Sequence, residues 1–150
     1  MRIRDAVEAD AERLAELTGA PTDVMRNLVH DRTVRVADRG SIADTQNVAA
    51  AASSDGSESP SERAIAGFVS FDAKPDTVHI SQVEGTPAAL ERLLKEPTRF
   101  ASQERMSVEM LVAVGETSKR EAAEAAGFTE IGSGPRFAGT STLRYRLEPP

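Results

Sequence analysis

The segment Ala64–Leu94, AIAGFVSFDAKPDTVHISQVEGTPAALERLL, organises the interpretation of the whole chain. It predicts two antiparallel strands joined by a tight turn at Lys74–Asp76, then a glycine-marked loop and a helix that begins at Pro87. A loop that leaves a strand and opens a helix presents unpaired backbone N–H groups and the positive end of a helix dipole, and both stabilise a bound phosphate. We therefore expect a small-molecule site of this protein to lie here.

The composition indicates a folded chain of 150 residues with 39% hydrophobic residues and no cysteine. The absence of cysteine excludes disulfides, thiolate metal sites and cysteine nucleophiles, and no His/Asp/Glu group has metal-ligand spacing. No apolar run approaches the roughly 20 residues that span a bilayer, and the first ten residues lack the apolar core of a signal peptide. We expect a cytoplasmic protein that binds no membrane and no metal.

The charge distribution argues against a nucleic-acid-binding protein. The chain has 24 acidic and 18 basic residues, a net charge of -6, and only three lysines, Lys74, Lys95 and Lys119. No basic cluster is present that could neutralise several phosphates of a nucleic acid. An acid-rich, lysine-poor composition is typical of proteins kept soluble in high salt, although an ordinary acidic cytoplasmic protein has a similar composition.

The first quarter of the chain predicts a strand, two helices and a second strand. Arg2–Arg4 forms the opening strand, and apolar residues recur with helical spacing from Val7 until Gly19, which ends the first helix. Pro21 can open the second helix. Thr33–Asp38 alternates apolar and polar residues as a half-buried strand does.

Residues 39–62 predict a long flexible surface loop inserted between two strands. The segment is rich in Ser, Ala, Asp and Gly, and the large apolar residues that anchor a loop are missing from its middle. Two interpretations remain open: an insertion without function, or a lid over the site.

Downstream of the opening segment, the helix continues with an expected kink at Pro97 and leads into the strongly apolar strand Ser107–Val114. A helix between two strands implies a parallel crossover. An alanine-rich helix, Ser118–Ala126, and two strands, Phe128–Gly132 and Thr140–Leu147, complete the order β-α-α-β-β-β-α-β-α-β-β. The prediction is a single α/β (α+β) domain over residues 1–150, with a mixed central sheet of about seven strands flanked by about four helices.

This order resembles the GNAT N-acetyltransferase superfamily over nearly the whole chain. The resemblance rests on four stretches: Ile3–Leu17 (IRDAVEADAERLAEL), Ile65–Phe71 (IAGFVSF), Gln82–Pro87 (QVEGTP) and Ala122–Gly132 (AAEAAGFTEIG). It implies an acetyl-CoA-dependent transferase that acetylates a small-molecule or peptide amine. Many members of the family form homodimers, so the resemblance also implies a homodimer.

The resemblance places the cofactor at the family motif Q/R-x-x-G-x-G/A, whose backbone binds the pyrophosphate of acetyl-CoA. It implies the cofactor-binding residues Gln82, Val83, Gly85, Thr86, Ala88 and Ala89. Pro87 replaces the second small residue of the motif and has no N–H to donate, and the connection is shorter than is usual in the family. A second register, with Ala88 or Ala89 at the small-residue position, is also open.

For catalysis, the resemblance directs attention to the strand Thr77–Val83 and its end. His79 and Glu84 are candidate bases for the acceptor ammonium, and Tyr145, the only tyrosine, is a candidate proton donor. Each also has a plain structural interpretation: a surface histidine, a solvated carboxylate and a packed ring. The tyrosine that the family often places before Gly-Phe is Ala123 here. A catalytically degenerate GNAT-like domain that acts as a binding or assembly module is therefore the alternative function.

Overall fold

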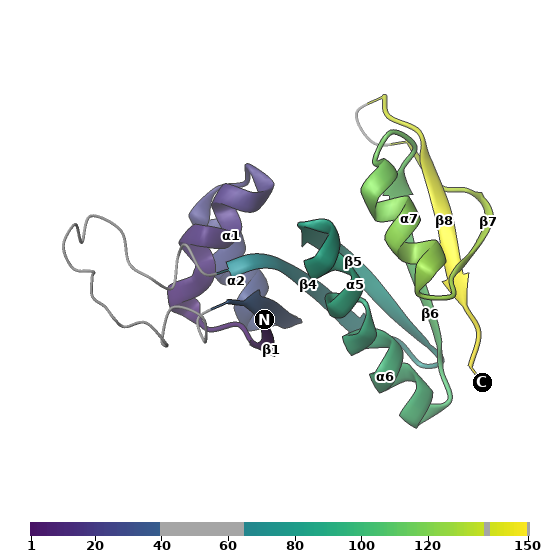
Figure 1. Ribbon diagram of the computed structural model, residues 1–150, viewed down its shortest axis with the longest axis horizontal. Coiled ribbons are helices and arrows are strands. Elements are labelled where there is room, and N and C mark those ends of the chain that lie inside the picture. The colour runs from purple at the N-terminus through teal and green to yellow at the C-terminus, as the bar shows by residue number, and fades with distance from the viewer. Residues whose placement is uncertain (40–64, 137–138, 150) are drawn as a thin grey trace.

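The computed structural model describes residues 1–39, 65–136 and 139–149, which form a seven-stranded mixed sheet with helices on both faces (Figure 1). The strands are β1 (Arg2–Asp5), β2 (Thr33–Asp38), β4 (Ile65–Ala73), β5 (Thr77–Gly85), β6 (Ser107–Ala113), β7 (Thr129–Ser133) and β8 (Thr142–Leu147), in the spatial order β1-β2-β4-β5-β6-β8-β7. The helices are the 3₁₀ turn η1 (Glu8–Asp10), α1 (Ala11–Thr18), α2 (Thr22–Asp31), α5 (Pro87–Leu93), α6 (Lys95–Glu104) and α7 (Thr117–Ala125). The predicted fold class and element order are confirmed. Apart from Arg39, the loop expected at residues 39–62 lies outside the described residues.

Local sequence signals set most of the helix ends. Gly19 ends α1 in the left-handed conformation, with φ of 78°. Thr86 caps α5, because its Oγ1 accepts the Ala89 N–H at 3.2 Å. The break expected at Pro97 lies instead at Leu94, between α5 and α6. Pro97 is in the first turn of α6, where a missing N–H leaves no helical hydrogen bond unmade.

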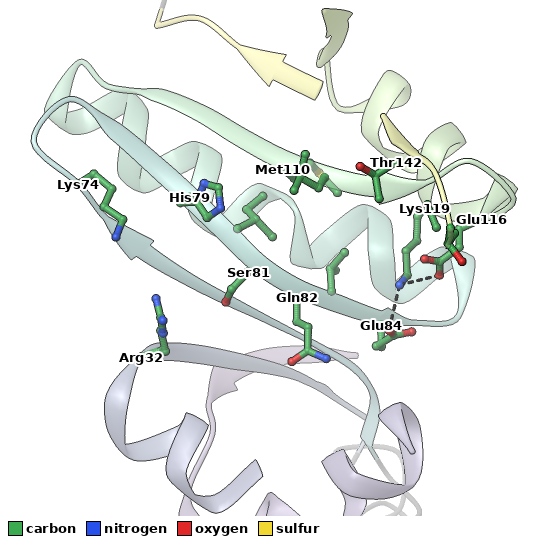
Figure 2. Close-up of a pocket in the computed structure, with 15 residues that line it drawn as sticks. Arg32, Lys74, His79, Ser81, Gln82, Glu84, Met110, Glu116, Lys119 and Thr142 are labelled. Atoms are coloured by element: carbon green, nitrogen blue, oxygen red, sulfur yellow. Dashed lines mark hydrogen bonds and ion pairs between the residues drawn. The ribbon is translucent and has the colours of Figure 1, made fainter. Parts of the chain in front are cut away.

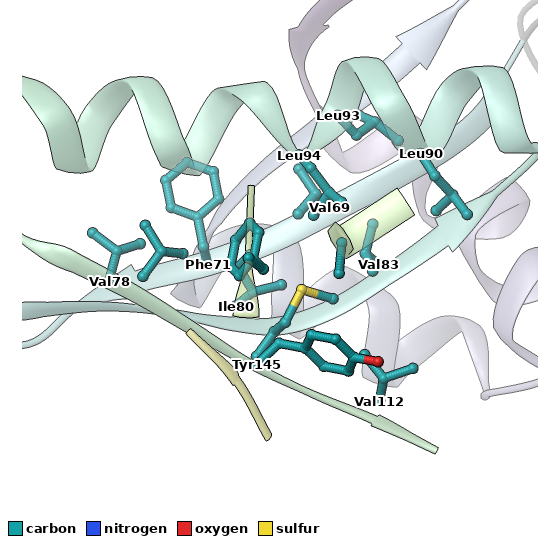
Figure 3. Packing of buried hydrophobic residues seen from close by; sticks show 14 of the residues in the cluster. Val69, Phe71, Val78, Ile80, Val83, Leu90, Leu93, Leu94, Val112 and Tyr145 are labelled. Carbon is teal, nitrogen blue, oxygen red and sulfur yellow. The ribbon is translucent and has the colours of Figure 1, made fainter. Parts of the chain in front are cut away.

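Two apolar clusters hold the helices against opposite faces of the sheet. Helices α1 and α2 pack on β2 and β4, with Leu14 and Met25 against Val36 and Phe68. Helices α5, α6 and α7 pack on the other face, in a larger cluster that reaches from β2 to β8 (Figure 3). The buried residues of the α1–α2 cluster include none from β5, β6 or β8.

Strand β5 pairs with its two neighbours, β4 and β6, in different directions and over different lengths, and this difference opens the sheet. Its pairing with β4 is antiparallel and skips Ser81, since Ser70 pairs with Gln82 and Phe71 pairs with Ile80. Its pairing with β6 is parallel and runs only from Thr77 to Ile80. An extra residue in one strand bends it and increases its twist. The end of β5 therefore follows β4, while the end of β6 follows β8, and the two strands separate beyond the bulge at Ser81.

A pair of facing glycines lets α5 begin directly above the end of β5. Gly67 of β4 lies opposite Gly85, whose φ is 147°. A Cβ added to Gly67 would lie 2.8 Å from the Gly85 Cα and would also clash with the Glu84 carbonyl oxygen. It would lie 3.2 Å from the Ala89 Cβ, on the first turn of α5. Gly67 is therefore a point of close approach between the backbones of β4 and β5.

We predict that Gly67→Ala destabilises the protein by about 1–3 kcal/mol, because the new methyl group would push against rigid backbone on β5. Urea unfolding followed by circular dichroism measures this free energy. Gly115→Ala is the matched control, since a Cβ at Gly115 meets nothing within 4 Å and φ there is not left-handed. We expect the control to change stability by less than about 0.5 kcal/mol. Equal stabilities of the two variants would contradict the close approach.

Candidate functional site

A cleft of about 740 Å³ opens where β5 and β6 separate (Figure 2). Its walls come from both strands, from the start of α7 and from the start of β8. The polar side chains that line it are Arg32, Lys74, His79, Ser81, Gln82, Glu84, Glu116, Lys119, Thr140 and Thr142. Apolar side chains, including Ile80, Val83 and Met110, form its floor. A cavity of this size, with polar side chains around an apolar floor, can hold a small molecule.

The bulge in β5 is held by two serines and lies on the cleft wall. Ser81 is the extra residue, and its Oγ donates to the Ser70 carbonyl oxygen at 3.2 Å. The two serine hydroxyl groups also hydrogen-bond to each other, and Ser70 is completely buried. Because a bulge residue leaves the regular ladder, backbone polar groups of β5 become available at this point. The Ser70–Ser81 pair therefore fixes the place where β5 bends away from β6.

An ion-pair cluster of Lys119, Glu84 and Glu116 lies at the end of the cleft next to α7. Lys119 of α7 donates from Nζ to Glu84 Oε2 at 2.9 Å and pairs with Glu116 Oε2 at 2.8 Å (Figure 2). Only 15% of the Lys119 side chain is exposed. Burial by itself lowers the pKa of Lys119, but the hydrogen bonds to Glu116 and Glu84 outweigh it and raise the pKa above its ordinary value. The ammonium group is thus held charged between β5 and α7.

The predicted base His79 lies near the other end of the cleft, on the paired half of β5. It is half-buried and stands beside Glu109 of β6 in the parallel register. Glu109 is itself held by Arg146, and by Arg144 at 3.7 Å. Arg32 and Lys74 line the same end of the cleft as His79 (Figure 2). The structure therefore brings His79 and Glu84 to one cleft, on either side of the bulge.

Tyr145, the third predicted catalytic residue, does not line the cleft. It is fully buried on β8, within the cluster under α7 (Figure 3). Its hydroxyl oxygen accepts a hydrogen bond from Arg120 Nε at 3.3 Å. Ala123, at the position where the resemblance implies a tyrosine, is also buried. Neither position presents a proton donor to the cleft.

The predicted cofactor residues are divided between strand and helix, and the loop expected there is almost absent. Gln82, Val83 and Gly85 belong to β5, while Ala88 and Ala89 belong to α5, so Thr86 alone separates the two elements. Gln82 lines the cleft with its side chain, whereas the Val83 side chain is largely buried in the core beneath. The strand is longer than predicted because the Gly67–Gly85 pair extends the β4 ladder by two residues.

Few backbone N–H groups at the start of α5 are free to bind a phosphate. The Thr86 N–H is donated to the Ala66 carbonyl oxygen at 3.2 Å, and the Ala89 N–H is donated to Thr86 Oγ1. Pro87 has no N–H. Within the part of the chain that the structure describes, Ala88 carries the one N–H of this first turn without a partner.

Sequence reasoning missed Ser81, Lys119, Arg32 and Lys74 as lining residues. A bulge has no signal in the sequence of one strand, because it exists only relative to the partner strand. Lys119 had a signal, since it is one of three lysines in an acidic chain and lies in the first turn of the predicted late helix. Its partner Glu84 lies 35 residues away, so the pair could not be read from local spacing.

We predict that Glu84→Gln lowers the pKa of Lys119, because it removes one of the two carboxylates that keep the ammonium charged. The measurement is an NMR titration of the Lys119 ζ-nitrogen, which is simple to assign among three lysines. A raised folded-state pKa means that the cluster stabilises the fold below the ordinary lysine pKa and that this contribution is lost as the pH rises through the folded-state value. Glu91→Gln, an exposed change on α5, is the control. An unchanged Lys119 titration in Glu84→Gln would disprove the pairing.

The described residues contain no group of three or more His, Asp or Glu side chains that could hold a metal ion. Among the helices described above, none is long and apolar enough to cross a membrane.

Comparison with known proteins found no matching family model and no matching curated protein. Solved structures do match. Arabidopsis thaliana NAA60 in complex with acetyl-CoA has a TM-score of 0.69 at 13% identity, over 98% of this chain and 97% of that chain. Ribosomal-protein-alanine N-acetyltransferase from Brucella melitensis has a TM-score of 0.67 at 15% identity, over 99% of each chain. A protein from Desulfovibrio desulfuricans ascribed to the GNAT acetyltransferases has a TM-score of 0.64 at 18% identity, over 98% of each chain. The chain therefore has the GNAT acetyltransferase fold.

Proposed function

We propose that this protein binds acetyl-CoA in the cleft between β5 and β6 and transfers the acetyl group to an amine. One observation carries the proposal: the two strands pair over four residues and then separate at the Ser81 bulge, leaving a lined cleft of about 740 Å³. Proteins of similar structure include the ribosomal-protein-alanine N-acetyltransferase and NAA60 described above, and NAA60 was solved in complex with acetyl-CoA. Their similarity supports acetyl transfer as the class of reaction.

The cleft offers more binding groups to the pantetheine arm of acetyl-CoA than to its diphosphate. Its apolar floor and its polar groups on β5 can hold the extended pantetheine arm, with Gln82 and the backbone at Ser81 as hydrogen-bonding partners. The diphosphate would lie at the start of α5, where the Ala88 N–H is the donor still available. We therefore expect the arm to supply most of the binding energy. When bound, the cofactor supplies an acetyl group activated for attack by an amine.

The residues of the chain would prepare the acceptor amine by removing its proton. His79 lines the cleft, and no charged partner of its ring is found among the described residues, so a ring nitrogen can take this proton directly. Glu84 is the alternative base, but its carboxylate is already held by Lys119. We therefore propose His79 as the base and Glu84 as a positioning residue.

Calorimetric titration with acetyl-CoA, repeated at high salt, tests the proposed cleft. We predict that Ala113→Phe, which places a ring on the cleft wall, weakens binding at least about tenfold, because an arm of this thickness cannot share the space. Ala125→Phe on the exposed side of α7 is the matched control and should bind as the unmodified protein does. Failure of the unmodified protein to bind millimolar acetyl-CoA would overturn the proposal. Binding without acetylation of any amine would identify a binding module instead.

A second prediction separates the two candidate bases. We expect His79→Gln to lower kcat/KM for an amine acceptor by about 100-fold, which is the usual contribution of a general base. Glu84→Gln should have a smaller effect, and the pH dependence of kcat/KM should disappear only in His79→Gln. His30→Gln, at an exposed histidine on α2, controls for loss of a histidine elsewhere. A pH profile that persists in His79→Gln would assign the base to another group.

A further inference from the structure

Two of the three lysines of this acidic chain line the cleft, and they lie at its opposite ends. Lys74 is in the turn before β5, and Lys119 is in the first turn of α7 (Figure 2). Lys119 is already neutralised by two carboxylates. Lys74 has no carboxylate partner among the described residues. The two ends of the cleft therefore differ in charge.

The end near Lys74 is basic. Arg32, at the end of α2, points into the same space as Lys74 (Figure 2). Its Nη1 donates to Asp72 Oδ2 at 2.5 Å, with 39% of the Arg32 side chain still exposed. Two cations thus line this end of the cleft, and no carboxylate among the described residues lines it, since Asp72, the partner of Arg32, is not a lining residue. His79 adds a ring that can donate a further hydrogen bond.

The end near Lys119 is acidic, because Glu84 and Glu116 outnumber the ammonium that they share. An acceptor whose amine lies between the two ends would be oriented by this difference in charge. From this pattern we infer that the acceptor is a peptide N-terminus with acidic side chains close behind it, its α-amine at the bulge and its carboxylates at Lys74 and Arg32. The inference rests on the proposed function.

Strand geometry sets the separation between these groups. From Thr77, next to the Lys74 turn, to Ser81 at the bulge, β5 rises by about 13 Å. The carboxylate of a free α-amino acid lies too close to its own amine to reach across this span. An acidic side chain at the second to fourth residue of a peptide can reach it, because an extended chain advances about 3.3 Å per residue. A polyamine would place a second cation against Lys74 and Arg32.

The diphosphate of acetyl-CoA does not account for the basic end. In the proposed pose it lies at the start of α5, and β5 is about 27 Å long from the Lys74 turn to that point. The cations at the turn are therefore available to the acceptor while the cofactor is bound.

Peptide binding to the full chain in the presence of CoA tests the inference without requiring turnover. The probes are three peptides that begin with alanine and continue with three aspartates, three asparagines or three lysines, and spermidine is a fourth. We expect the aspartate peptide to bind about fivefold tighter than the asparagine peptide at low salt, with the difference shrinking as ionic strength rises. Lys74→Glu should abolish this preference. Lys95→Glu, which makes the same charge change at the third lysine, outside the cleft, should preserve it.

Each result decides between the possibilities. The inference would be overturned if the three peptides bound equally or if none of them bound. It would also be overturned if Lys95→Glu lost as much of the preference for the aspartate peptide as Lys74→Glu does. Acetylation of spermidine or the lysine peptide in preference to the aspartate peptide would overturn it while supporting the proposed function. A Lys74-dependent preference without any acetylated product would support the acidic-peptide site at Lys74 and Arg32 but overturn both the proposed acetyl transfer and the role of the peptide as its acceptor.

Discussion

The extra residue in β5 is the constraint on which the site depends. A strand that paired fully with both neighbours would leave a continuous sheet and no room between β5 and β6. Because Ser81 has no counterpart on β4, the strand bends just where its parallel pairing with β6 stops. The Ser70 hydroxyl, completely buried, holds the bend in place. Opening a sheet in this way forgoes ladder hydrogen bonds, so the hydrogen-bonded pair Ser70–Ser81 and the facing glycines Gly67 and Gly85 keep the end of β5 on β4.

The cleft is polar at its ends and apolar beneath, and the charges at its ends are handled differently. At the α7 end, a partly desolvated lysine is held by two carboxylates, an arrangement that binds α7 to β5 as well as balancing charge. At the turn end, the cations reach solvent and can therefore remain charged without full pairing. A ligand could bind Lys74 and the exposed part of Arg32 without breaking an existing salt bridge. Binding Lys119 would instead require displacing Glu84 or Glu116.

Local sequence patterns predicted the elements well and the site only in part. Periodicity and helix caps located the strands and helices. What local patterns could not show were relationships between distant segments: the bulge defined by Ser70 against Ser81, and the bridge from Glu84 to Lys119. The sequence predicts that the strand ends at Val83, but pairing with β4 extends it to Gly85 and leaves only Thr86 before α5. The resemblance implies Tyr145 as a cleft residue, yet the alternation along β8 directs its ring into the core.

Strand β8 lies between β6 and β7, although it follows both along the chain. The wall of the cleft formed by Thr142 therefore cannot be assembled while the chain is still being made in order, since β6 must wait for residues 142–147 to insert beside it. During synthesis, the apolar strand β6 would have an unpaired edge until the last strand arrives. Such an edge is a target for unintended strand pairing, so the nascent chain has a vulnerable interval that the finished protein does not.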